Sequence, residues 1–213
     1  MTESPGAHLV LLGDSIFDNA AYVPDGLPVI EHLRQTIPSG WQATLLAIDG
    51  DITSGVAGQT LGVPSTATHL VISVGGNDAL QQSGVFREPV GTVGEALFHL
   101  ADVMNEFRWS YRQMLRHVLS LNLPVAVCTI YNSVPGLGEM EKTALALFNE
   151  TILQEAFKVR VPVIDLRLLC DEDEDYSHLS PIEPSHGGGG KIARAIATLM
   201  EEYDFSSGRS TII

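Results

Sequence analysis

The sequence predicts a single α/β domain over residues 1–213, a three-layer α/β/α sandwich on a five-stranded parallel sheet. Five short runs rich in Val, Ile and Leu show little polar alternation, which is typical of strands buried on both faces. Helix-like segments separate these runs, as crossovers between parallel strands require. No composition shift divides the chain, and a hydrophobic content of 45% is enough for one core. Only a tail at about 205–213 is expected to be loose.

The strands are predicted at the apolar runs 8–13, 43–48, 69–75, 124–130 and 161–166. Apolar residues at steps of three and four predict the helices. They are expected at 27–37, 92–121, 141–158 and 191–203. The last helix follows four consecutive glycines, 187–190, which are expected to weaken its start.

The charge balance excludes two classes of partner. The formal net charge is −14, with 26 acidic residues against 12 basic ones, so the chain repels nucleic acid and anionic membrane surfaces. No run reaches the ~18 apolar residues of a membrane span. The start "MTESPGAHLVLLGDS" lacks the basic and apolar regions of a signal peptide, so a cytoplasmic location is expected.

No metal or other cofactor is expected. The acidic run 171–175 consists of adjacent residues, which cannot all face one ion, and is interpreted as a solvated loop. Cys128 and Cys170 lack a C-x-x-C partner, and we expect two buried free thiols.

Four residues suited to one chemistry follow the predicted strands. Ligand sites in open α/β sheets form at the carboxyl ends of the strands. Ser15 follows the first strand in "VLLGDSIFDN", and Gly50 follows the second. Asn77 follows the third in "SVGGND", and His186 lies beyond the fifth in "EPSH". A serine, a histidine and hydrogen-bond donors for an oxyanion are the set that a serine hydrolase needs.

Each residue has a chemical role in this hypothesis. Ser15 attacks a carbonyl carbon, neutral His186 accepts its proton at physiological pH, and Glu183 orients the imidazole. The oxyanion is held by the N–H groups of Ser15 and Gly50 and by the amide of Asn77, and each such donor is worth ~3 kcal/mol. His178 is a second candidate for the base.

With the blocks "GDSIFDN", "AIDGDITSG", "GGND" and "EPSH" in this order, the chain resembles the SGNH hydrolases, also called the GDSL esterase/lipase family. The resemblance covers nearly the whole chain and implies the flavodoxin-like SGNH hydrolase fold. It also implies Ser15 as nucleophile, Gly50 and Asn77 as oxyanion residues, and Glu183 and His186 as the last block.

The last block departs from the family pattern, which is Asp-x-x-His and commonly continues with a proline after the histidine. Here Glu183 replaces the aspartate, and four glycines follow His186. Glutamate serves in some serine-hydrolase triads, so the substitution is compatible with catalysis. The glycines leave the position of His186 loosely specified.

The sequence therefore predicts a metal-independent esterase that forms an acyl-enzyme and has a small-molecule ester as its partner. The absence of a lid-like apolar segment favours small or soluble esters. Asp14, Asn19 and Tyr131 are candidate substrate contacts, although Asp14 is also expected to help fix the loop and turn chemistry explains Asn19 equally well. A thioesterase or carbohydrate O-deacetylase with the same triad remains an alternative, as does a binding protein with a degraded triad.

Overall fold

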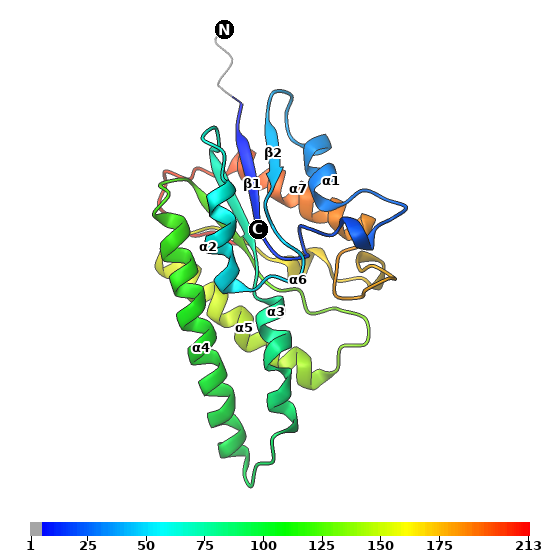
Figure 1. Ribbon diagram of the computed structural model, residues 1–213, viewed down its shortest axis with the longest axis vertical. Helices are drawn as coiled ribbons and strands as arrows, with labels where there is room; N and C mark the ends of the chain where they lie inside the picture. The colour runs from blue at the N-terminus through cyan, green and yellow to red at the C-terminus, as the bar shows by residue number, and fades with distance from the viewer. Residues whose placement is uncertain (1–5) are drawn as a thin grey trace.

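The computed structural model describes residues 6–213, whose strands form one parallel sheet of five strands (Figure 1). The strands are β1 (His8–Gly13), β2 (Gln42–Leu45), β3 (His69–Ser73), β4 (Val125–Cys128) and β5 (Val163–Ile164). Their order across the sheet is β2-β1-β3-β4-β5. This order confirms the predicted α/β fold. It also puts the reversal of strand order between β1 and β3, where flavodoxin-like sheets bind ligands.

The longer helices lie where the sequence predicts them, with shifted ends. They are α1 (Val29–Thr36), α4 (Val93–Leu119), α5 (Glu139–Lys158) and α7 (His186–Glu202). Short helices that periodicity did not predict are α2 (Val56–Gln59), α3 (Gly76–Gln81) and α6 (Leu166–Leu169). Single 3-10 turns are η1 (Ala20–Tyr22), η2 (Thr53–Gly55), η3 (Thr60–Gly62), η4 (Gln82–Arg87) and η5 (Asp173–Asp175).

Alternate side chains of β1 pack into two separate cores, one on each face of the sheet. The sheet and the helices on its two faces are the three layers. Leu9 and Leu11 pack in the cluster that contains the buried side chains of α1 and α7. Val10 and Leu12 pack in the cluster that contains those of α4 and α5. Because both faces of β1 are buried, its sequence is apolar without alternation. Cys128 and Cys170 are buried free thiols, as predicted.

Helix α7 begins earlier than predicted because the glycines allow close packing. Ser185 caps the helix, its hydroxyl accepting from Gly188 N at 3.2 Å. A Cβ on Gly188 would lie 2.2 Å from the carbonyl oxygen of Asp175, so only glycine fits there. The carboxylate of Asp175 is buried and pairs with Lys191 at 2.8 Å. This end of the acidic run is therefore packed rather than solvated.

The tail also differs from expectation in its last three residues, which pair with β5. Val163 N donates to Thr211 O at 2.8 Å, and Ile213 N donates to Val163 O at 3.0 Å. Asp165 N donates to the carbonyl of Ile213 at 2.8 Å. These bonds extend the sheet beyond β5.

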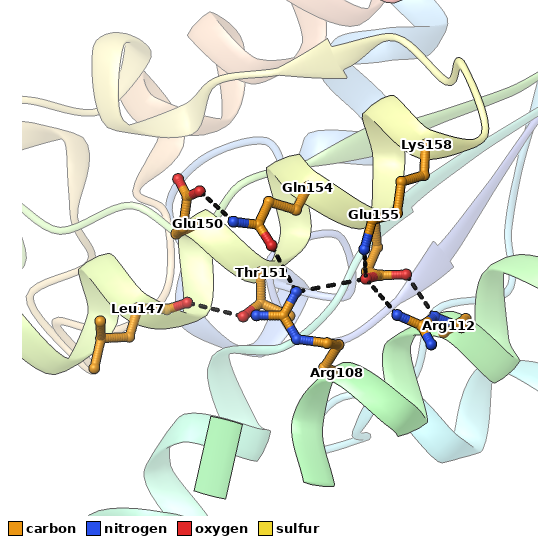
Figure 2. Close-up of polar contacts among 8 residues, drawn as sticks. All are labelled: Arg108, Arg112, Leu147, Glu150, Thr151, Gln154, Glu155 and Lys158. Carbon is orange, nitrogen blue, oxygen red and sulfur yellow. Dashed lines mark hydrogen bonds and ion pairs between the residues drawn. The ribbon is translucent and has the colours of Figure 1, made fainter. Parts of the chain in front are cut away.

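Helices α4 and α5 are joined by ion pairs around Glu155, whose carboxylate faces Arg108, Arg112 and Lys158 (Figure 2). Helix α3 and the N-terminal half of α4 both extend past the carboxyl ends of the strands (Figure 1). Within residues 6–213, no helix combines the length and the apolar character that crossing a bilayer demands.

Candidate active site

Ser15 lies in a tight turn directly after β1. Gly13 has a φ of +126°, and a Cβ there would lie 1.8 Å from the carbonyl oxygen of Ser73 on β3. Asp14 N donates to that same carbonyl at 3.0 Å. The carboxylate of Asp14 accepts from Ile16 N at 3.1 Å and closes the turn around Ser15. The glycine lets the chain turn against β3, and the turn presents the serine at the edge of the sheet.

Gln59 on α2 holds the end of β1 in place. Its Oε1 accepts from Gly13 N at 2.8 Å, and its Nε2 donates to Gly13 O at 2.7 Å. The same Nε2 donates to the carboxylate of Asp51 at 2.7 Å. This buried amide satisfies the backbone of the residue two positions before Ser15.

Ser15 contacts a carboxylate directly. Its Oγ donates to Oε1 of Glu183 at 3.2 Å, and both residues are buried. Glu183 is 3% exposed, and its Oε2 has no hydrogen-bond partner within residues 6–213. Burial raises the pKa of Glu183 above its usual range, against the opposing effect of the hydrogen bond from Ser15. The serine and a carboxyl group of raised pKa therefore form a buried pair.

The segment that carries Glu183 is fixed at three successive carbonyls. The carbonyls of residues 182, 183 and 184 accept in turn from Tyr131 Oη, Ser177 N and Asn19 Nδ2. Asn19 also accepts from Val29 N at 2.9 Å and is fully buried, so it has no surface to offer a substrate. The structure thus gives Asn19 a positioning role in place of the predicted substrate contact. Tyr131 holds the segment and also lines the cavity beside Ser15.

His186 does not lie between Ser15 and Glu183, as the predicted triad requires. Its Nδ1 accepts from Leu27 N at 2.9 Å and lies 3.1 Å from His32 Nε2 on α1. The two imidazole rings are 4.5 Å apart between centroids. Within residues 6–213, no hydrogen bond joins His186 to Ser15 or Glu183. Two residues, Pro184 and Ser185, separate Glu183 from His186, and α7 begins at His186, so their side chains contact different parts of the protein.

The candidate oxyanion donors are only partly assembled. Asn77 on α3 lines the cavity beside Ser15, and its Nδ2 donates to the carbonyl of Asp51 at 2.8 Å. That bond fixes the orientation of the amide and leaves the second N–H of Nδ2 available to another acceptor. Gly50 has a φ of +79° and lies outside the cavity lining, one residue before Asp51. The oxyanion role of Gly50 stays a prediction.

Asp14 is buried beside Ser15 and is protonated at neutral pH. Burial raises its pKa to about 8, and the negative charges of Asp78 and Glu183 add to the effect. Asp14 also lines the cavity. When Asp14 is neutral, the Ser15–Glu183 pair has no negative charge from Asp14 beside it.

A cavity of about 140 Å³ opens beside Ser15 between α3, η4, α4 and α5. Its walls are mostly apolar and include Leu80, Phe86, Val103, Ile130, Leu145 and Phe148. Such a space accepts an apolar group attached to a carbon near Ser15. No lid-like segment was predicted, yet η4 and residues Leu100 and Val103 of α4 line this cavity.

Ser15 thus lies directly after β1, beside the reversal of strand order at which α/β sheets bind ligands. Residues 11–188 match the GDSL-like Lipase/Acylhydrolase family, and the chain belongs to this family. The family accounts for the order of the Ser15, Gly50 and Asn77 blocks along the chain. No curated protein sequence matches the chain significantly.

Solved structures of similar fold include esterases and lipases. A lipase from a goat rumen metagenome has a TM-score of 0.70 at 17% identity, covering 89% of this chain and 95% of its own. The acetylxylan esterase Axe2 from Geobacillus stearothermophilus has a TM-score of 0.66 at 17% identity, covering 96% and 98%. An extracellular lipase from Streptomyces rimosus has a TM-score of 0.63 at 16% identity, covering 93% and 100%. At these identities the likeness shows the fold.

The contact between Ser15 and Glu183 had a signal in the sequence. In the family the proline follows the histidine of the last block, and in this chain Pro184 follows Glu183 rather than His186. A comparison based on the proline puts Glu183 in the place of the histidine. Gln59 had no such signal, because it lies in a short helix with no apolar period.

Proposed function

We propose that the protein hydrolyses carboxylic esters with an apolar acyl group through an acyl-enzyme on Ser15. The observation that supports this most is the position of Ser15, whose hydroxyl lies in a tight turn at the mouth of an apolar cavity. The acyl group of the ester occupies the cavity, and the carbonyl carbon then lies next to Oγ. Esters of short to medium acyl length fit a cavity of about 140 Å³ better than bulk lipid does.

The oxyanion of the tetrahedral intermediate is held by N–H donors at the edge of the sheet. Asn77 supplies the second N–H of its amide, and Ser15 supplies its backbone N–H. The bond from Asn77 to the carbonyl of Asp51 keeps the amide in one orientation before the substrate binds. A donor that does not have to reorganise contributes more to catalysis than a mobile one.

A thioester has the same acyl carbon and the same cavity requirement, so thioesterase activity is an outcome of the substrate screen. The apolar walls favour an aliphatic acyl group over the polar surface that a carbohydrate needs. The cytoplasmic location stays a prediction from the sequence.

Labelling with a fluorophosphonate followed by intact-mass measurement tests the function. Native protein is expected to gain one adduct, and Ser15→Ala is expected to gain none. Ser65→Ala is the control, since Ser65 is exposed and does not line the cavity, and it should label at the native rate. A panel of p-nitrophenyl esters and acyl thioesters then defines the substrate. A folded native protein that gains no adduct and hydrolyses no ester would leave the binding-protein alternative in place.

A further inference from the structure

We propose that Glu183 is the base that removes the proton of Ser15, with no histidine between the two side chains. This inference rests on the proposed function of Ser15 and names a further catalytic group for it. The contact is direct, since Ser15 Oγ donates to Glu183 Oε1 at 3.2 Å. A base must lie within hydrogen-bond reach of the proton that it takes, and Glu183 meets this condition.

Hydrogen bonds hold the backbone of the segment that carries Glu183. The backbone carbonyls of residues 182, 183 and 184 accept from Tyr131, Ser177 and Asn19 in turn. The donors come from three parts of the chain that are far apart in sequence. A base that must keep its distance to a nucleophile benefits from such support.

The two histidines that the sequence offered do not take this place. His186 accepts from Leu27 N, and its ring packs at a tilt against that of His32 on α1. His178 is exposed, and within residues 6–213 it forms no hydrogen bond with Ser15. The carboxylate is therefore the base that the geometry presents.

Glu183 is buried, and only its Oε1 takes part in the contact with Ser15. The ionisable groups that face Glu183 are acids and phenols: Asp14, Asp49, Tyr22 and Tyr131. Burial raises the pKa of Glu183 toward the range in which a carboxylate is an effective base.

The proton balance of the reaction is complete with this pair. As Ser15 Oγ bonds to the acyl carbon, its proton moves to Glu183 Oε1 and the carbonyl electrons move to the oxyanion. The oxyanion collapses, the ester C–O bond breaks, and protonated Glu183 gives its proton to the departing alkoxide. A water molecule then gives a proton to Glu183 and attacks the acyl carbon. The bond to Oγ breaks, and the proton returns to Ser15.

Labelling rates of three variants test the assignment. Glu183→Gln keeps the size of the side chain and an oxygen that can accept from Ser15, but removes the base. Its fluorophosphonate labelling is expected to fall by ~10²-fold or more. His186→Gln is the matched control, because it keeps an acceptor for Leu27 N, and it should label within threefold of native protein. Ser15→Ala should not label.

The outcomes separate this inference from the proposed function. Labelling of Glu183→Gln within threefold of native, or a loss in His186→Gln as large as that in Glu183→Gln, overturns the assignment and leaves Ser15 as nucleophile. Absence of Ser15-dependent labelling in native protein overturns both proposals. Thermal unfolding of each variant shows whether it is folded.

Chemical rescue gives a readout that a structural role would not produce. Glu183→Ala is expected to label slowly, and added sodium formate should restore its rate by tenfold or more, because formate supplies a small carboxylate in the vacated space. Sodium chloride at equal ionic strength is the control. If Glu183→Gln does not fold, this measurement decides: an increase with formate supports the assignment, and no increase overturns it.

Discussion

Arg112 on α4 holds both carboxylate oxygens of Glu155 on α5. Nε lies 2.8 Å from Oε2, and the terminal nitrogen Nη2 lies 2.9 Å from Oε1 (Figure 2). Glu155 is 3% exposed, and Lys158 and Arg108 also contact its carboxylate. The two helices joined in this way are the two long walls of the cavity beside Ser15. This link therefore supports the shape of the proposed acyl site.

Glu155→Gln is expected to lower the free energy of unfolding by about 1 to 3 kcal/mol, because it leaves partly buried cations without a charged partner. For a chain of this size, each kcal/mol corresponds to about 2 to 4 °C in Tm. The pair lowers the pKa of Glu155 to about 2. Its stabilisation is thus present above the unfolded value of 4.5 and is lost as the pH falls toward 2.

Thermal unfolding at pH 7 and pH 3 checks this prediction, and the difference between variant and native protein should be smaller at pH 3. Glu139→Gln is the control, since Glu139 is 94% exposed on the same helix. An equal loss of Tm in both variants would contradict the role of the link.

Asp14→Asn is expected to stabilise the protein at alkaline pH. The folded protein keeps Asp14 protonated up to a pKa of about 8, whereas the unfolded chain loses that proton near 3.8. Stability therefore falls as the pH rises between these values, and the loss is complete above 8. Asparagine does not ionise and carries no such penalty. The free energy of unfolding of the variant should therefore exceed that of native protein by on the order of a few kcal/mol at pH 9 and by almost nothing at pH 4.

Urea unfolding at pH 4, 7 and 9 measures this difference. The exposed Asp25 provides the control substitution, Asp25→Asn, which should show no pH-dependent gain. A gain that is the same at all three pH values would mean that Asp14 is not buried as an acid.

Ala144→Trp is expected to shorten the acyl groups that the protein accepts. Ala144 lines the cavity from α5, and an indole there fills space that an acyl chain needs. The ratio of octanoate to acetate hydrolysis, measured as kcat/KM for p-nitrophenyl esters, should fall by ~10-fold or more. Ala146→Trp is the control on the exposed side of the same helix. An unchanged ratio in Ala144→Trp would place the acyl group elsewhere.

Asn77→Ala is expected to lower kcat by ~10²- to 10³-fold with a smaller change in KM, because an oxyanion donor acts mainly in the transition state. Steady-state kinetics on the best ester measures both constants. Gln35→Ala removes an exposed amide on α1, outside the cavity lining, and should have little effect on kcat. A rise in KM alone would assign Asn77 to substrate binding.

The sequence predicted the sheet because buried parallel strands leave an apolar run that few other structures produce. Long helices such as α4 have enough turns to show their period, whereas α2 and α3 span only four and six residues and show none. The order of strands was not readable from the runs themselves, and it came from the family resemblance.

The candidate site was predictable where a residue follows a strand, as Ser15 and Asn77 do. It was not predictable where a side chain's direction depends on packing. Glu183 lies in a loop three positions before His186, the first residue of α7. The bonds to the carbonyls of residues 182–184 hold the segment of Glu183, and His186 contacts Leu27 and His32 instead. Gln59 and Asn19 act through backbone contacts, for which their residue type gives no sequence pattern.

The pairing of residues 211–213 with β5 has a consequence for self-association. An uncovered edge strand presents unpaired N–H and C=O groups to other molecules. Thr211 and Ile213 occupy those groups on Val163 and Asp165. A chain that ends at Ser210 would leave these backbone groups of β5 unpaired, and its molecules are expected to associate edge to edge as the concentration rises.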